Sequence, residues 1–318
     1  QSMHRLLFKD TKNLPEIPEV NFPNRIKEVP YPYEHDISVL SLHYITLYSR
    51  IHVASSRIDQ NLIETFNKYS KSCCDTLVID SQCILLDEFK YFIAPLVFLR
   101  DLTKIHFKNF APYCVCNLIH FMVKTIPRVT IFILEGYNAI VPEQLRLDRL
   151  ESNLPLSFIF KNCSLPGKTT QQLFLQFKQS NVELQRLSLI DFKMSTKRFR
   201  LLGEVIQSRP FRTMEIFELN ELPSTKFHET HIIQLLTLLR HHCRFLSRLA
   251  ISNWSKPITV YMENFQNFGF LNEIEIDGHT MTHIIPESLI ISKRINRMNF
   301  SKCVFTFDSL KSLFLNLS

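Results

Sequence analysis

Ten short strings with the pattern apolar-x-x-apolar-x-apolar recur along this chain, and their spacing limits the fold more than any other feature. The clearest four are Leu184–Leu189, Phe211–Ile216, Leu246–Ile251 and Leu271–Ile276. With the second apolar residue of each string as its anchor, successive anchors lie 24 to 29 residues apart, except for one interval of 35. The ten anchors are Ile51, Leu77, Ile105, Phe132, Phe158, Leu187, Met214, Leu249, Ile274 and Met298. A fixed period of this length is typical of a repeat architecture.

Each repeat reads as a short strand followed by a helix. The apolar-x-apolar part predicts a strand, because alternate side chains point to opposite faces. The residues that follow have helical periodicity, most clearly in Asp87–Phe98, Thr170–Ser180, Thr196–Ser208 and His231–Cys243. One such unit cannot bury its apolar face alone, so neighbouring units stack. The sequence therefore predicts an α/β solenoid of about ten repeats, a curved horseshoe with parallel strands inside and helices outside.

The repeats divide the chain into two parts. Residues 1–36 are rich in proline and irregular, and we expect them to form a lead-in that caps the first repeat. Residues 37–318 form the solenoid, which begins with a capping strand at Ile37–Leu42. The long interval before Leu249 contains an insertion at residues 220–230, which predicts a surface loop or a binding element.

Composition excludes several classes of protein. The chain has 318 residues, of which 45% are hydrophobic, but it contains no apolar run long enough for a transmembrane helix. Its eight cysteines are scattered, which predicts free thiols in the cytoplasm, with the nucleus as the alternative. The net charge of +7 is mild for this length and allows an acidic partner or nucleic acid. The oligomeric state is not indicated.

Strand alternation predicts which side chains face a partner. Residues one before, one after and three after each anchor point away from the core. On this pattern Lys104, His106 and Lys108 form a basic spot, and Glu273, Glu275 and Asp277 form an acidic strand. Between them lies an apolar diagonal formed by Ile131, Ile133, Ile159, Ile190 and Phe217. An exposed apolar patch with a charged rim is typical of a protein interface. The alternatives are that the lead-in covers this diagonal or that these residues are simply sparse apolar surface.

No arrangement of residues predicts catalysis, a metal site or a cofactor. Gly167-Lys168-Thr169 lacks the preceding glycine of a phosphate-binding loop. His241, His242 and Cys243 stand at the end of a predicted helix, where capping or solvation explains them better than metal binding. The carboxylates of Glu273 and Glu275 share a strand, but no third group accompanies them. We therefore expect a protein that is not an enzyme.

The period near 27 and the strand strings resemble the ribonuclease-inhibitor-like class of leucine-rich repeats over residues 37–318. Within that class the chain is most similar to CARMIL-type actin regulators, whose capping strand is also followed closely by the first full repeat. This resemblance implies a cytoskeletal scaffold. The chain departs from the common consensus because no asparagine occupies the position five residues after the anchor, so we expect apolar packing to hold the turns.

Three functions follow. The first is a non-catalytic scaffold that binds another protein through the concave face. The second is a nucleic-acid-binding adaptor that uses the basic residues Lys104, His106, Lys108, Lys161 and Arg186. The third is a regulator of an enzyme, such as a GTPase-activating protein or a substrate-recognition subunit of a ubiquitin ligase.

Overall fold

A computed structural model gives the architecture of the greater part of the chain. It describes residues 75–80, 102–109, 115, 119–120, 122–124, 126–137, 147, 150–192, 195–220, 229–252, 259–261, 265, 268–285 and 295–317. The lead-in, the capping strand, the anchor Ile51, the predicted helix Asp87–Phe98 and residues 221–228 of the insertion lie outside the described residues.

The described strands form one open parallel sheet in which each strand, apart from the short β8, pairs with the next one along the chain. The strand order is β1-β2-β3-β4-β5-β6-β7-β9-β10, and the short β8 pairs with the far end of β9. The strands are β1 Thr76–Asp80, β2 Lys104–Lys108, β3 Ile131–Glu135, β4 Leu156–Lys161, β5 Leu184–Ile190, β6 Ile216–Asn220, β7 Arg248–Ser252, β8 Thr259–Tyr261, β9 Glu273–Ile285 and β10 Arg297–Val304. This in-order parallel pairing is compatible with a solenoid-like α/β fold.

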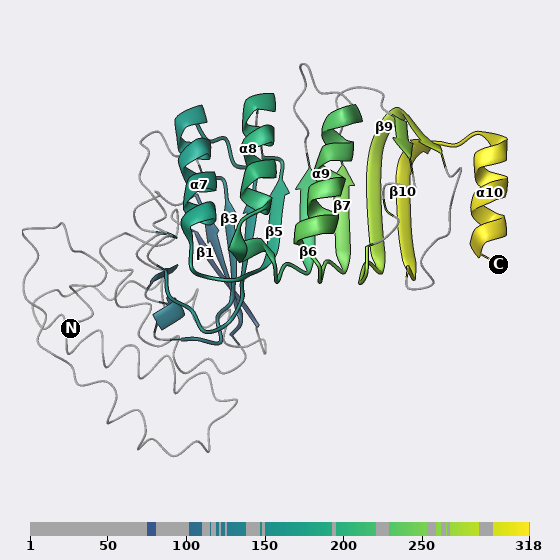
Figure 1. Ribbon diagram of the computed structural model, residues 1–318. Helices are drawn as coiled ribbons and strands as arrows, with labels where there is room; N and C mark the ends of the chain where they lie inside the picture. Colours follow the sequence, from purple (N-terminus) through teal and green to yellow (C-terminus); the bar gives the residue numbers. More distant parts are fainter. Residues whose placement is uncertain are drawn as a thin grey trace, which may run out of the picture.

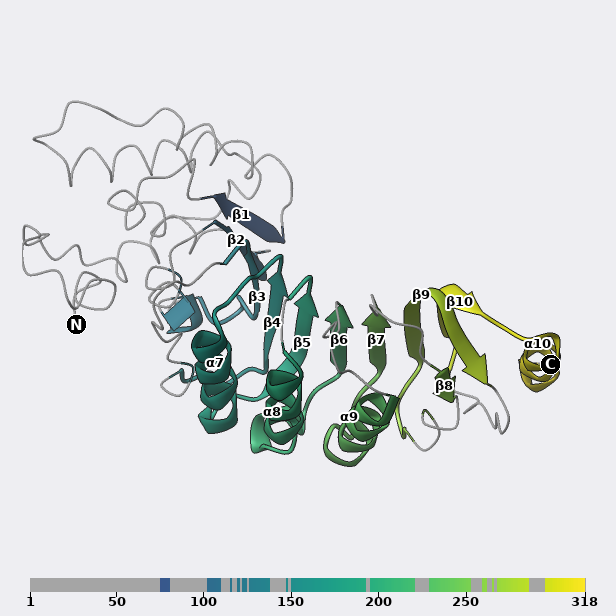
Figure 2. The same ribbon diagram turned by 90° about the horizontal axis from the view of Figure 1, so that it is seen from above.

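Helices cover one face of this sheet. Helices α7 (Gly167–Gln179), α8 (Thr196–Ile206) and α9 (Glu229–His242) lie side by side, each in the connection that leads to the next strand (Figure 1). Seen from above, the row of strands curves, with these helices on its convex side (Figure 2). We call the opposite side of the sheet the concave face. Helix α10 (Phe307–Leu317) stands apart beyond β10.

Phenylalanine rings link the repeats through the core. Phe158 contacts Phe132 of the preceding strand and Phe177 of α7, with ring centroids 5.7 and 5.6 Å apart. Phe177 in turn contacts Phe211, at 6.5 Å, in the short 3-10 helix η3 (Arg209–Phe211). All four rings are at most 1% exposed. Contacts between the rings of successive units stabilise the stack beyond the contribution of the apolar area that the rings bury.

The strand register confirms the predicted anchors in the described repeats, with one correction. Leu77, Ile105, Phe132, Phe158 and Leu187 pair in succession, and so do Leu249, Ile274 and Met298. Between these two series, Leu187 pairs with Phe217, which pairs with Leu249. The predicted anchor Met214 is therefore wrong, because it precedes β6 and is buried below the strand. The corrected string is Met214–Leu219, which matches the same apolar pattern three residues later.

A left-handed residue directly follows four successive strands, β2 to β5, and a residue at the same position inside β10 is also left-handed. The residue four after the anchor has positive φ at Asn109 (58°), Gly136 (66°), Asn162 (51°), Asp191 (50°) and Lys302 (53°). Asparagine, aspartate and glycine adopt this conformation most readily. The backbone amide of this left-handed residue also extends the hydrogen bonding between strands. Asn109, Gly136 and Asn162 each donate to the carbonyl of the last residue of the next strand, at 3.0 Å. β9 and β10 differ, because they continue past this position to Ile285 and Val304.

Two cysteines modify the expectation that apolar packing holds these turns. Cys163 and Cys303 occupy the position five after the anchor in units far apart in the chain. Each thiol donates to a carbonyl of the preceding strand, Cys163 to Leu134 at 3.4 Å and Cys303 to Ile276 at 3.6 Å. Burial raises the pKa of Cys163 to about 12, so the thiol keeps the proton that it donates. Phe192, at the same position, is fully buried, as expected for apolar packing.

Candidate interaction surface

The concave face consists of three rows of side chains that run across the strands. In β2, β3 and β7 the residues alternate between half-buried and buried, so that one set faces the core and the other set faces this surface. The register brings the first outward residues of these strands into one row with those of their neighbours. In β2, β3 and β7 the residues one before, one after and three after the anchor therefore lie on the side opposite the core-facing set.

Isoleucines form the apolar centre of this face. Ile131 and Ile133 on β3, Ile190 on β5 and Ile216 on β6 are half-buried. Ile159 on β4 lies between Ile133 and Ser188 in the register and is only 4% exposed, so it forms the floor of the group. We call these five residues the isoleucine patch.

The shifted register removes one residue from the predicted diagonal and adds another. Phe217 does not face the concave side, because it is itself the anchor of β6 and is fully buried in the core. Ile216 takes its place on the concave face, one residue before the anchor. The string pattern contained this information, since Met214–Leu219 fits the template as well as Phe211–Ile216 does.

The predicted basic spot carries carboxylates that largely compensate it. Lys104 Nζ lies 2.6 Å from Asp75 Oδ2, and its hydrogen bond holds the pKa of Asp75 below the usual value. His106 Nε2 lies 2.7 Å from Glu135 Oε2, and Lys108 Nζ lies 4.0 Å from the same oxygen. Burial lowers the pKa of His106 against the opposing effect of Glu135, so His106 adds little positive charge at neutral pH. A surface that binds phosphate groups needs cations that are not already paired, whereas Lys104 and Lys108 both lie next to carboxylates.

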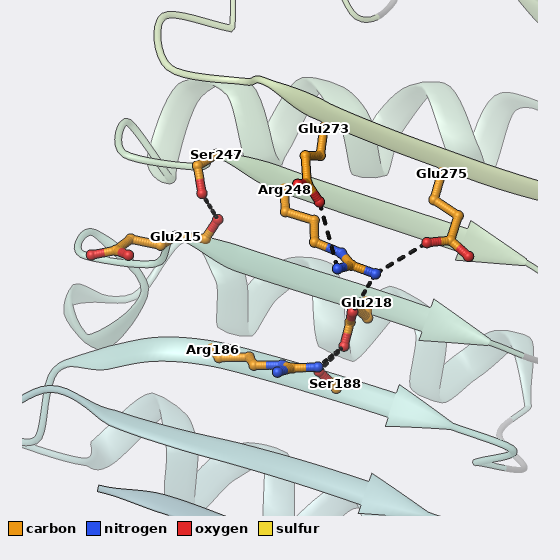
Figure 3. Close-up of polar contacts among 8 residues, drawn as sticks. All are labelled: Arg186, Ser188, Glu215, Glu218, Ser247, Arg248, Glu273 and Glu275. Carbon is orange, nitrogen blue, oxygen red and sulfur yellow. Dashed lines mark hydrogen bonds and ion pairs between the residues drawn. The ribbon is translucent and has the colours of Figure 1, made fainter. Parts of the chain in front are cut away.

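The predicted acidic strand is likewise compensated from the neighbouring strand (Figure 3). Arg248 on β7 reaches Glu275 Oε2 at 3.1 Å and Glu273 Oε2 at 3.5 Å, both on β9. The same guanidinium lies 3.3 Å from Glu218 Oε1 on β6. One arginine therefore contacts three carboxylates that come from both adjacent strands.

Glu218 extends this network toward the isoleucine patch. Its second oxygen lies 2.5 Å from Arg186 Nη2 on β5 and accepts a hydrogen bond from the Ser188 hydroxyl. Arg186 Nε also donates to Ser188 Oγ at 2.8 Å. The Glu218 side chain is 10% exposed, so this carboxylate depends on both arginines for compensation. Glu218 was not singled out from the sequence, because the register anchored at Met214 gave Glu215 the outward position that Glu218 occupies.

Ion pairs extend across β5, β6, β7 and β9, where Arg186 and Glu218 lie between Ile159 and Ile216, and a second group joins β1, β2 and β3. Among the described residues, no group of three or more histidine, cysteine, aspartate or glutamate side chains is arranged to hold a metal ion. In the same part of the chain, no helix has the length and apolarity required to cross a membrane.

Comparison with known proteins adds no identity. No protein-family model matches this chain, and no curated protein matches its sequence.

Proposed function

We propose that this chain is a leucine-rich-repeat protein of the ribonuclease-inhibitor-like class, with about ten repeats, that acts as a non-catalytic scaffold. The recurring strand strings, the in-order parallel sheet and the positive φ four residues after the anchor support the repeat class. A cytoskeletal role rests on the resemblance to CARMIL-type regulators alone.

The observation that carries the proposed function is the isoleucine patch on the concave face. Four of its five side chains are only half-buried, although isoleucine is among the residues most often found inside proteins. The charged groups beside and between these isoleucines are paired within the sheet, so the apolar side chains are bordered by compensated polar groups. A protein interface has this composition, with an apolar core and a polar rim.

The nucleic-acid alternative receives less support. Of the five basic residues that it requires, Lys104, Lys108 and Arg186 each lie within 4.0 Å of a carboxylate, and His106 contacts Glu135. Lys161 alone has no ion pair with a described residue. Binding of phosphates would have to break these pairs first.

Paired purifications from cell extract with concave-face variants test the scaffold. Ile133→Asp with Ile190→Asp places two charges in the patch and spares the buried Ile159. Asn299→Asp is the matched control, because it adds a charge to an exposed concave position on β10. We expect a partner retained by the wild type and the control to be lost from the double variant, with circular dichroism unchanged. An identical set of retained proteins for all three would contradict the proposal.

A further inference from the structure

A second surface lies at the edge where the strands begin, the lower edge in Figure 1. The segments that lead into β6, β7 and β9 run side by side there. Ser247 N donates to Glu215 O at 2.8 Å, and Asn272 N donates to Ser247 O at 2.9 Å. Side chains on these three segments therefore belong to one continuous surface, which we call the rim.

Two exposed phenylalanines form the apolar part of the rim. Phe245 and Phe270 are each 52% exposed, and their ring centroids are 5.7 Å apart. Each stands four residues before its anchor, Leu249 or Ile274, so the repeat itself places the two rings next to each other. Glu183 and Thr213 hold the same position before β5 and β6, which shows that the position accepts polar residues. Packing within the repeat thus does not require the aromatic pair.

Four arginines lie on the segments before β6 and β7 or at their ends. Arg209 and Arg212 lie between α8 and β6, and Arg240 and Arg244 lie at the end of α9 and before β7. None of the four forms an ion pair with another described residue, in contrast to Arg186 and Arg248 on the concave face. Arg240 is in the last turn of α9, where its positive charge interacts favourably with the helix dipole. Arg209, Arg212 and Arg244 are exposed and lie after the ends of the helices.

Little acidic charge opposes these arginines. The three segments, residues 207–215, 240–247 and 268–272, contain one carboxylate, that of Glu215. Glu215 Oε2 accepts a hydrogen bond from Gln185 Nε2 at 3.3 Å. The rim therefore carries positive charge beside an apolar pair of rings. On the concave face, by contrast, the arginines are already paired with carboxylates of neighbouring strands.

We propose that the rim binds an extended acidic segment of another protein, in which aspartate or glutamate residues flank one aromatic or large aliphatic side chain. The apolar side chain would cover Phe245 and Phe270 while the carboxylates pair with the arginines. Aromatic residues and arginine are the groups that interfaces concentrate at their centres. Strands are about 4.8 Å apart and an extended chain advances about 3.3 Å per residue, so a few residues reach all three segments.

The size of the rim favours a peptide over a nucleic acid. Four arginines, with Glu215 among them and Glu183 on the neighbouring segment, neutralise few phosphates, whereas nucleic-acid binding depends on many such contacts. The two rings also contact each other, so only their outer faces remain for stacking on a base.

Selection from a displayed library of short random peptides on the whole chain tests this proposal. We expect the enriched peptides to be acidic with one large apolar residue. In fluorescence anisotropy with the best synthetic peptide, Arg209→Ala with Arg244→Ala should weaken binding by about tenfold or more, and Phe245→Ser should do the same. The matched controls are Arg200→Ala, exposed on α8, and Phe314→Ser, 66% exposed on α10, which should bind as the wild type does.

The outcomes separate this proposal from the scaffold function. Ile133→Asp should leave peptide binding unchanged, because Ile133 is on the concave face. Enriched peptides without acidic residues, or full binding by the double arginine variant, would overturn the proposal. Oligothymidylate or phosphatidylserine vesicles that bind through these arginines, with no acidic peptide selected, would overturn it as well.

Discussion

The register of β6 determines which side chains the concave face presents, and two alanine substitutions measure it. The structure places Phe217 in the core with 0% exposure and Ile216 half-buried on the concave face. In the register anchored at Met214 these roles are exchanged, with Ile216 inside and Phe217 outside. Met214 itself is buried, so its substitution gives no information on the concave face.

The expected costs differ enough to be distinguished. Truncation of a fully buried phenylalanine to alanine typically costs about 3–5 kcal/mol, since it combines lost transfer free energy with a residual cavity. Ile216→Ala removes three carbon atoms at about 0.8 kcal/mol for each fully buried one, so about half of this sum, near 1 kcal/mol, is expected. Phe217→Ala should therefore lower the free energy of unfolding by about 2–4 kcal/mol more than Ile216→Ala does.

Urea denaturation followed by far-ultraviolet circular dichroism provides the measurement. The midpoint of Phe217→Ala should shift strongly and that of Ile216→Ala only slightly, with similar slopes. Equal shifts, or a larger shift for Ile216→Ala, would refute the register and with it the membership of Ile216 in the isoleucine patch.

Three further perturbations test the turns, the basic group and the ion-pair network. Gly136→Ala should cost about 1 kcal/mol or more in urea denaturation, because alanine is strained at φ 66°, whereas Gly269→Ala, with open space around its added methyl group, should be near neutral. Burial lowers the pKa of His106 from 6.5, so the unfolded chain binds the proton more readily and stability falls as the pH drops below 6.5; His106→Gln should reduce this fall in a pH series of urea titrations. Arg248→Met should cost about 1–2 kcal/mol, less than a fully buried pair because the guanidinium is one-third exposed, and adding Glu218→Gln should recover part of the loss in the same assay.

Sequence periodicity predicted the elements well because each repeat imposes its own pattern. The expected helices Thr170–Ser180, Thr196–Ser208 and His231–Cys243 correspond to α7, α8 and α9 within a few residues at either end. The error at β6 arose because two overlapping strings match one template. Anchoring at Phe217 changes the neighbouring intervals from 27 and 35 residues to 30 and 32, which is closer to a constant period.

The pairing of charges could not be predicted in the same way, because it depends on neighbours from other repeats. The carboxylates of Glu273 and Glu275 read as an acidic strand until the register brings Arg248 beside them. Similarly, Glu135 compensates a basic strand that lies 27 residues earlier in the repeat pattern. A signal for the turns was present in the sequence: Asn109, Gly136, Asn162 and Asp191 share one position and suit positive φ.

The two proposed surfaces differ in whether their arginines already contact carboxylates, and this difference predicts how salt affects binding at each. On the concave face a partner gains little from Arg186 or Arg248, since each already contacts Glu218. If either arginine turned toward a partner, the Glu218 carboxylate would be poorly compensated. Affinity there must come mainly from burial of the isoleucine patch, which salt hardly weakens. At the rim, Arg209, Arg212 and Arg244 are exposed and form no ion pair with a described residue, so their attraction for carboxylates is screened within about 10 Å at 0.1 M salt. Rising salt should therefore release a rim-bound acidic peptide well before it releases a partner held by the concave face.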